Sequence, residues 1–208
     1  MSFPQSVLMS DPWNKGKLVG QNPPPLKQEQ IWSIRIRLEM SKKFRDLALF
    51  NLALDSKLRS CDLVKLLVRD VSNGSDILAR TQVVQQKTKR PVMFEITAKT
   101  RESLTNWIKL KKLSSLDYLF QSRRHSSEHI TTRQYARLVK GWGSSIGLDR
   151  TAYGTHSLRR TKPTIIYRKT KNLRAVQILL GHTNLESTVR YLGVEVDDAF
   201  ELSEHIEI

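Results

Sequence analysis

Four side chains that can bind phosphate or move protons fall within residues 156–191 of this chain. The stretch "GTHSLRR" holds His156 and Arg159, and "LLGHTNLESTVRYL" holds His182 and, nine residues later, Tyr191. Arginine presents a permanently charged fork to phosphate oxygens, and histidine exchanges protons near neutral pH. Tyrosine can act as a nucleophile once its hydroxyl, of reference pKa about 10, loses its proton. Whether the four side chains meet depends on the elements that carry them.

The local sequence places His182 in a turn between two short helices. Asn172 can cap a helix whose apolar stripe is Leu173, Val176, Leu179 and Leu180. Gly181 stands where a residue just past a helix end is expected, so His182 falls in the turn. Asn184 can cap the next helix, whose predicted inward side is Leu185, Val189 and Leu192.

Each half of this set also has an ordinary structural interpretation. His156 and Arg159 are three positions apart and share a helix face, where such pairs are usually solvated. Tyr191 lies outside the inward stripe of its helix, which also suits an aromatic at the edge of a core with a solvated hydroxyl.

The composition favours a DNA- or RNA-binding protein of one substantial domain. The chain has 208 residues, of which 39% are hydrophobic, and 35 Lys and Arg against 20 acids give a net charge of +15. Such a charge favours a polyanionic partner, and the alternative is a basic but unrelated enzyme. Cys61 is the only cysteine, which excludes a disulfide scaffold. With no secretory signal in residues 1–25 and no run of about 18 apolar residues, we expect a cytoplasmic protein without membrane contact.

The pattern along the chain predicts a mainly α-helical fold with a small antiparallel β-sheet (α+β). Residues 1–25 hold five of the seven prolines and are interpreted as a mobile arm or extended strap. Strands are predicted at 76–85 and 90–97, joined by a basic turn at 86–90. Helices are predicted at 27–40, 42–55 (with Phe44, Leu47, Ala48, Asn51, Leu52 and Leu54 inward), after "SKLRS" (with Leu63, Leu66 and Leu67 inward), and at 97–113, 131–148, 156–169, 173–180, 184–192 and 195–206.

The two motifs resemble the signature boxes of the tyrosine recombinases, also called the phage integrase family. Those boxes are a His-x-x-Arg and a Leu-Gly-His followed by a helix that ends in Tyr. The resemblance implies two residues upstream. An arginine is expected before a helix, and Leu-Arg-Ser-Cys-Asp-Leu supplies Arg59; a lysine is expected in a β-turn, and Gln-Gln-Lys-Thr-Lys-Arg supplies Lys87. The likeness covers roughly residues 27–195, and its six positions are filled in order by Arg59, Lys87, His156, Arg159, His182 and Tyr191.

The resemblance implies the catalytic-domain fold of that family and DNA cleavage by tyrosine. The hydroxyl attacks a backbone phosphorus, forms a 3′-phosphotyrosyl bond and expels a 5′-hydroxyl, which can reverse the step. Arg59, Arg159 and His182 would stabilise the phosphoryl oxygens. Lys87 would protonate the leaving oxygen and His156 would accept the tyrosine proton. No cofactor or metal is required; a metal site of His156, His182 and Cys61 is the disfavoured alternative.

Three features loosen the match. Lys89 is two residues from Lys87 and could share its face of the hairpin, so the proton donor could be either. Lys57 stands where the family often has glycine. Pro163 lies four residues after Arg159, so the helix either begins near Thr161 or bends there.

The predicted organisation has three parts: a proline-rich arm (1–25), a catalytic domain (26–194) and an acidic tail (195–208). The arm is shorter than the helical domain that most family members carry there, so a stand-alone catalytic domain with a weaker hold on DNA is expected. The tail has six acids and no Lys or Arg, and is a final helix that packs on its own subunit or on a neighbour. The expected partners are double-stranded DNA, three further copies in a tetramer on paired sites, and an accessory DNA-binding protein.

Three functions remain open from the sequence. The first is a site-specific recombinase or integrase from a bacterium, phage or mobile element. The second is a non-catalytic DNA-binding regulator, which would have no need of Tyr191. The third is a nicking-closing enzyme resembling the type IB topoisomerases.

Overall fold

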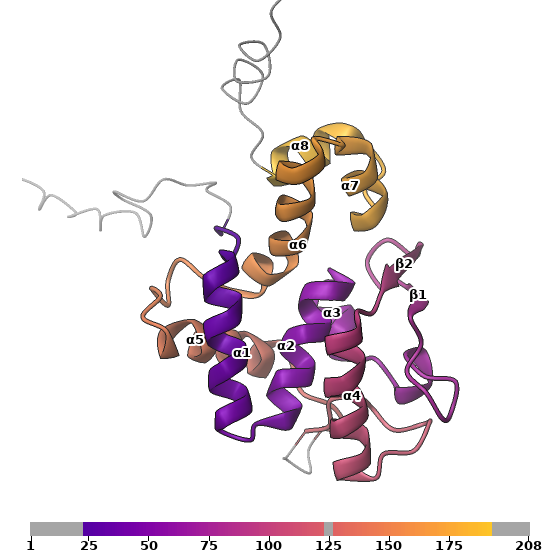
Figure 1. Ribbon diagram of the computed structural model, residues 1–208. Helices are drawn as coiled ribbons and strands as arrows, with labels where there is room; N and C mark the ends of the chain where they lie inside the picture. The colour runs from indigo at the N-terminus through magenta and orange to yellow at the C-terminus, as the bar shows by residue number, and fades with distance from the viewer. Residues whose placement is uncertain (1–22, 123–126, 193–208) are drawn as a thin grey trace, which may run out of the picture.

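The computed structural model describes residues 23–122 and 127–192, and it is mainly helical with one two-stranded antiparallel sheet (Figure 1). The predicted fold class is confirmed. The elements are α1 (Gln28–Met40), α2 (Phe44–Ser56), α3 (Ser60–Leu63), the 3-10 helix η1 (Val68–Asp70), β1 (Arg80–Val84), β2 (Pro91–Glu95), α4 (Ala98–Lys111), α5 (Thr132–Ser145), α6 (Thr155–Thr170), α7 (Leu173–Leu180) and α8 (Leu185–Leu192). The predicted helix at 195–206 lies outside the described residues. No helix in the described part of the chain is long and apolar enough to cross a bilayer.

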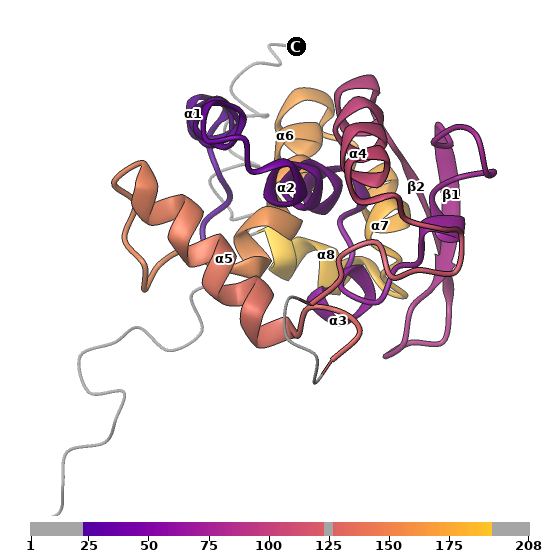
Figure 2. The same ribbon diagram turned by 90° about the horizontal axis from the view of Figure 1, so that it is seen from below.

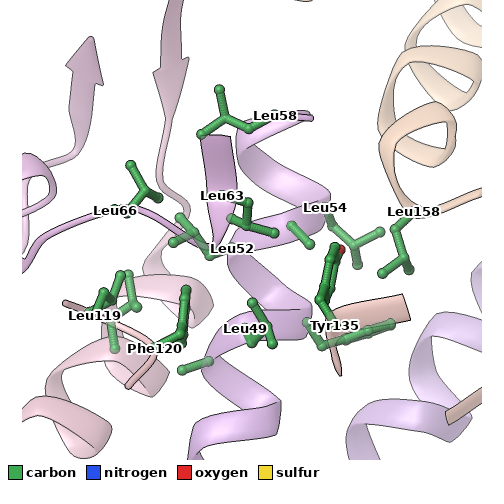
Figure 3. Packing of buried hydrophobic residues seen from close by; sticks show 14 of the residues in the cluster. Leu49, Leu52, Leu54, Leu58, Leu63, Leu66, Leu119, Phe120, Tyr135 and Leu158 are labelled. Carbon is green, nitrogen blue, oxygen red and sulfur yellow. The ribbon is translucent and has the colours of Figure 1, made fainter. Parts of the chain in front are cut away.

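Helix α2 forms the centre of the main core. Ten of its 13 residues are buried, and α1, α4, α5 and α6 surround it (Figure 2). Leu49, Leu52 and Leu54 project from it toward Leu63, Tyr135 and Leu158 on three other elements (Figure 3). A helix covered on so many sides buries residues around most of its circumference, so the single inward stripe predicted for it is too narrow. Phe44, predicted inward, is 39% exposed because it lies at the N-terminal end of α2, beyond the centre of this packing.

The predicted third helix is mostly replaced by irregular backbone. Only Ser60–Leu63 is α-helical, and the chain then pairs with a distant segment. The amide of Leu119 donates to the carbonyl of Leu66 at 2.8 Å, and the amide of Val68 donates to the carbonyl of Asp117 at 3.0 Å. These long-range bonds satisfy backbone groups that a longer helix would pair within itself, which local periodicity cannot reveal.

Helix α6 begins at Thr155 and continues through Pro163, close to the bounds predicted at 156–169, so the alternative start near Thr161 is excluded. Proline has no amide hydrogen to donate to the carbonyl four residues earlier, which is that of Arg159. The ring is buried and the helix extends to Thr170. Packing in the fold therefore outweighs the local cost of the proline.

The last two helices rest on a second, smaller apolar cluster. Val176 and Leu180 of α7 and Leu192 of α8 are buried together, and Tyr191 packs against them. Leu185, predicted to face inward, is 44% exposed, and Thr188 occupies the buried position of α8 instead. A cluster this small is expected to hold α7 and α8 less firmly than the main core holds its helices.

Candidate active site

The side chain of Arg59 is oriented by the turn that follows strand β1. It is the residue before α3, with an extended backbone, and its Nη1 donates to Oε1 of Gln85. Gln85 is 1% exposed, and the same oxygen also accepts the hydroxyl of Thr88 at 2.9 Å. One buried amide oxygen thus ties Arg59 to the turn of the β-hairpin.

Arg159 is the most enclosed cation of the site. It is only 4% exposed, and its Nη2 donates to the carbonyl of Leu180, the last residue of α7, at 3.3 Å. Its Nε and Nη1 are buried and have no hydrogen-bond partner among the residues described. Buried unpaired donors on a permanent cation are rare because they cost free energy, and they suit an anion that is to be bound. The solvated interpretation of Arg159 is therefore wrong.

His156 and His182 are both held neutral. Burial, followed by the charges of Arg159 and Arg59, lowers the pKa of His182 to about 4. The same causes, together with the charge of Arg160, lower the pKa of His156. His182 sits in the predicted turn, where its Nδ1 lies 3.1 Å from Oγ1 of Thr188. Near neutral pH His182 offers a hydrogen bond rather than a charge, and His156 can accept a proton.

Tyr191 lies between His182 and two arginines. Its ring meets that of His182 edge-on at 5.3 Å between centroids, and the Cζ atoms of Arg159 and Arg160 lie 5.9 Å and 5.6 Å from its centroid. Its hydroxyl is buried and makes no well-formed hydrogen bond in the described part of the chain, but it lies close enough to the Arg159 guanidinium to interact with it, so the predicted solvated hydroxyl is wrong. Burial raises the pKa of Tyr191, while the charges of Arg159 and Arg160, the hydrogen-bonding interaction with Arg159 and the charge of Arg59 oppose that rise.

Electrostatic interactions connect five of the six predicted residues in the described part of the chain, and Lys87 is not among the five. The charges of Arg59 and Arg159 act on His156, His182 and Tyr191 alike. Lys87 is exposed in the turn after β1, and within residues 23–122 and 127–192 it makes no hydrogen bond to the other five. Lys89 is also exposed, with a left-handed backbone, so the choice between the two lysines stays a prediction. No three His, Cys, Asp or Glu side chains of the described residues gather so as to hold a metal ion.

Gly181 is required at the turn that carries His182. Its φ is +66°, and a Cβ atom there would lie 2.6 Å from Cγ2 of Val92 on β2. The glycine therefore permits both the end of α7 and the close approach of that end to the hairpin.

Gly181→Ala should destabilise the fold by about 1–3 kcal/mol, because the left-handed backbone and the overlap with Val92 both carry a cost. Chemical denaturation measures this change. Val92→Ala removes the clashing methyl, so the double variant should lose less than the sum of the two single changes. Additive losses would show that the contact with β2 is unimportant.

Lys57 occupies a strained and desolvated position just before Arg59. Its φ is 55°, in the left-handed region, which explains why glycine suits this place. The side chain is 2% exposed, and its Nζ donates to the carbonyl of Asp55 at 2.7 Å. Burial, and then the charge of Lys162, lowers the pKa of Lys57 to about 8.

Burying the charged form of Lys57 lowers the free energy of unfolding, and this loss should disappear as pH rises and Lys57 becomes neutral. The unfolded chain restores the pKa to about 10.5, so between pH 8 and 10.5 it binds more protons than the folded chain, and stability rises with pH. Across this pH window the free energy of unfolding should rise by roughly 3 kcal/mol. In urea unfolding, the stability of wild type relative to Lys57→Met should therefore improve across it. A difference that is independent of pH would show that Lys57 is not desolvated.

Sequence reasoning missed the polar groups that orient the site. Asp55, at the end of α2, accepts hydrogen bonds from Lys162 Nζ at 2.7 Å and Thr100 Oγ1 at 2.6 Å. It thereby ties α4 and α6 to the main core. Gln85 and Arg160 were missed as well. A buried polar side chain leaves no periodic signal, and the adjacent pair of arginines at 159–160 was the one available hint.

A model of the phage integrase family matches residues 25–197. The chain belongs to this family. Probable integrase/recombinase YoeC of Bacillus subtilis (strain 168) is 30% identical over 169 residues, which cover 81% of this chain and 88% of YoeC. Tyrosine recombinase XerC of Caldanaerobacter subterraneus subsp. tengcongensis is 27% identical, over 88% of this chain and 55% of XerC, so the chain spans about half the length of that relative.

The fold of this integrase-family chain is that of known tyrosine recombinases. The crystal structure of XerA recombinase superposes with a TM-score of 0.73 at 19% identity, over 90% of this chain and 67% of XerA. XerH recombinase in its post-cleavage complex with difH gives 0.68 at 21% identity, over 89% of this chain and 54% of XerH. The chain thus has the fold of a tyrosine recombinase catalytic domain, as the sequence motifs predict.

Proposed function

We propose that this domain cuts and rejoins DNA at specific sites, with Tyr191 as the nucleophile. The observation that carries the proposal is the contact of Tyr191 with His182 and with Arg159, whose unpaired donors are buried beside it. A non-catalytic regulator would need DNA contacts but no tyrosine beside such donors. Structures of similar fold, XerH on difH and the Tn1549 integrase on transposon right-end DNA, are titled as DNA complexes, and the net charge of +15 suits the same partner.

In the proposed reaction the scissile phosphate occupies the unpaired donors of Arg159, with Arg59 on the same phosphoryl group. The Tyr191 oxygen attacks phosphorus, the bond to the 5′-oxygen breaks, and a 3′-phosphotyrosyl linkage remains. The tyrosine proton passes to neutral His156 directly or through the phosphate, and Lys87 supplies a proton to the leaving oxygen. His182 donates a hydrogen bond to the non-bridging oxygens. A new 5′-hydroxyl reverses these steps.

Access to the hydroxyl requires a movement. The Tyr191 oxygen is enclosed by protein, so attack needs a shift of its side chain or of α8. The small cluster beneath α8 makes that shift less costly than a rearrangement of the main core. We infer that DNA binding separates Tyr191 from Arg159, since a phosphate bound to Arg159 competes with Tyr191 for the space beside the guanidinium and for its charge.

The proposed assembly and setting follow from the same chemistry. Recombination of two duplexes needs four active sites, so we infer a homotetramer on paired DNA sites, with an accessory DNA-binding protein where this domain alone binds weakly. The division into arm, catalytic domain and acidic tail stays part of this proposal, as does docking of the tail on a neighbouring subunit. A bacterial or phage mobile element is the inferred setting.

The proposal is tested with a set of overlapping nicked duplexes that together cover the DNA flanking the gene. A nick just 3′ of the scissile phosphate lets the short fragment that carries the new 5′-hydroxyl diffuse away, so cleavage should accumulate a denaturant-stable protein–DNA band. Binding without any such band would support the regulator instead. Relaxation of single-site plasmids with no need for a second site would support the topoisomerase-like enzyme.

Lys87→Ala should be slow on normal DNA but close to wild type on DNA with sulfur at the 5′-bridging position. Sulfur leaves readily without a proton, so only loss of the proton donor is rescued. Lys89→Ala, the matched control, should affect both substrates equally and less at low salt, as a backbone contact does. Rescue of Lys89→Ala rather than Lys87→Ala would make Lys89 the donor.

A further inference from the structure

Arg160 contacts Tyr191 on one side and the start of the described chain on the other. Its Cζ lies 5.6 Å from the centroid of the Tyr191 ring, and its Nη1 donates to the carbonyl oxygen of Pro23 at 2.9 Å. The residue is 5% exposed, and its Nε has no hydrogen-bond partner among the described residues. A surface arginine that is merely solvated would keep its guanidinium in water, so this placement demands another explanation.

The carbonyl of Pro23 is itself fixed to the main core. Three residues later, the amide of Leu26 donates to Oγ1 of Thr161 at 3.0 Å, and the Leu26 side chain is buried in the main core. Residues 23–26 therefore cross α6 at two consecutive positions, Arg160 and Thr161. The bond to Pro23 positions the guanidinium relative to the main core and not relative to α8.

Tyr191 belongs to the other, smaller cluster. It packs with Val176, Leu180 and Leu192, which α7 and α8 contribute. Beside this cluster the ring contacts His182 and Arg159, and its hydroxyl makes no well-formed hydrogen bond in the described part of the chain. Arg160 thus links an element of low expected rigidity to one of high rigidity.

We propose that Arg160 is a positioning residue for Tyr191, which holds the tyrosine ring beside Arg159 and sets its place relative to the chain that enters α1. The attraction between a desolvated guanidinium and an aromatic face supplies the force. The inference rests on the proposed function only in taking Tyr191 as the nucleophile. It predicts that loss of Arg160 changes the environment of Tyr191 even in the free protein.

A second consequence is electrostatic and supports the same geometry. The charge of Arg160, after that of Arg159, lowers the pKa of Tyr191 against the effect of burial. Removing the guanidinium should therefore raise the pKa of Tyr191. If Arg160 were instead a further ligand for phosphate, its loss would weaken DNA binding.

Fluorine NMR of the full chain labelled with 3-fluorotyrosine tests the inference without DNA. Tyr191→Phe identifies the Tyr191 resonance, and fluorination lowers the phenol pKa so that titration is feasible in folded protein. In Arg160→Gln the resonance should move and its titration midpoint should rise. Arg160→Lys should move the resonance but retain part of the charge effect, and the other tyrosine resonances report whether each variant is folded.

Arg168→Gln is the matched control, since Arg168 is an exposed arginine of the same helix whose charge is not among those acting on Tyr191. It should leave the Tyr191 resonance and midpoint unchanged. An Arg160→Gln protein with wild-type resonance and midpoint would overturn the inference.

Cleavage under single-turnover conditions at saturating DNA separates this inference from the proposed function. Arg160→Gln should form adduct roughly threefold to thirtyfold more slowly than wild type, with unchanged DNA affinity. Equal or faster cleavage by Arg160→Gln would overturn the inference and leave the function intact. If wild type forms no adduct at all, the proposed function fails, and the fluorine titration still decides the role of Arg160.

Discussion

Tyr191→Phe should abolish the covalent protein–DNA band while leaving duplex affinity nearly unchanged. Only the nucleophilic oxygen is lost, and the ring keeps its packing against His182 and the small cluster. Nicked duplexes measure the adduct, and gel shifts measure the affinity.

The same variant should not be destabilised. The Tyr191 hydroxyl is buried and makes no well-formed hydrogen bond in the described part of the chain, so its removal relieves a desolvated group and gives up only the close approach to Arg159. The Tm of Tyr191→Phe should therefore equal or slightly exceed that of wild type. An adduct that persists in this variant would show that another side chain is the nucleophile.

Arg159→Ala should slow cleavage by on the order of a hundredfold or more, the scale of losing a charged donor to a transition state. Arg159→Lys should restore little, because an ammonium cannot replace a fork that bonds Leu180 and still presents Nε and Nη1. Single-turnover rates on nicked DNA measure both variants, and Arg59→Ala should show a loss of the same order. Arg168→Ala, an equal loss of charge on the same helix, is the control.

Near-normal cleavage by Arg159→Lys would make Arg159 a structural residue. Slow cleavage by an Arg159 variant could also come from misfolding, because Arg159 donates a hydrogen bond to the carbonyl of Leu180 that ends α7. The two causes can be told apart. A folding defect should lower Tm and reduce DNA affinity together, whereas loss of transition-state stabilisation lowers the rate at saturating DNA and leaves both unchanged.

Local patterns predicted most elements, and the exceptions have identifiable causes. The helices at 27–40, 97–113 and 173–180 and the hairpin are found within a few residues of their predicted bounds, because each follows from spacing and caps within one segment. The helix predicted around Leu63–Leu67 fails since the backbone there pairs with residues 117–119. Phe44 and Leu185 fail because a periodic pattern does not distinguish the middle of a buried face from its exposed end.

The sequence by itself determined the family and the fold class and supplied, in order, the six residues proposed for the site, since motif spacing and residue type are local properties. Only the tertiary structure decided that Arg159 is buried with unpaired donors, that the Tyr191 hydroxyl is enclosed, and that five of the six side chains share one field of charge. It also decided that Gln85 holds Arg59 and that Arg160 reaches Pro23, 137 positions away. Such contacts arise from how α6, α7 and the hairpin pack around the core, and burial, pKa and unpaired donors depend on that packing rather than on neighbours in the chain.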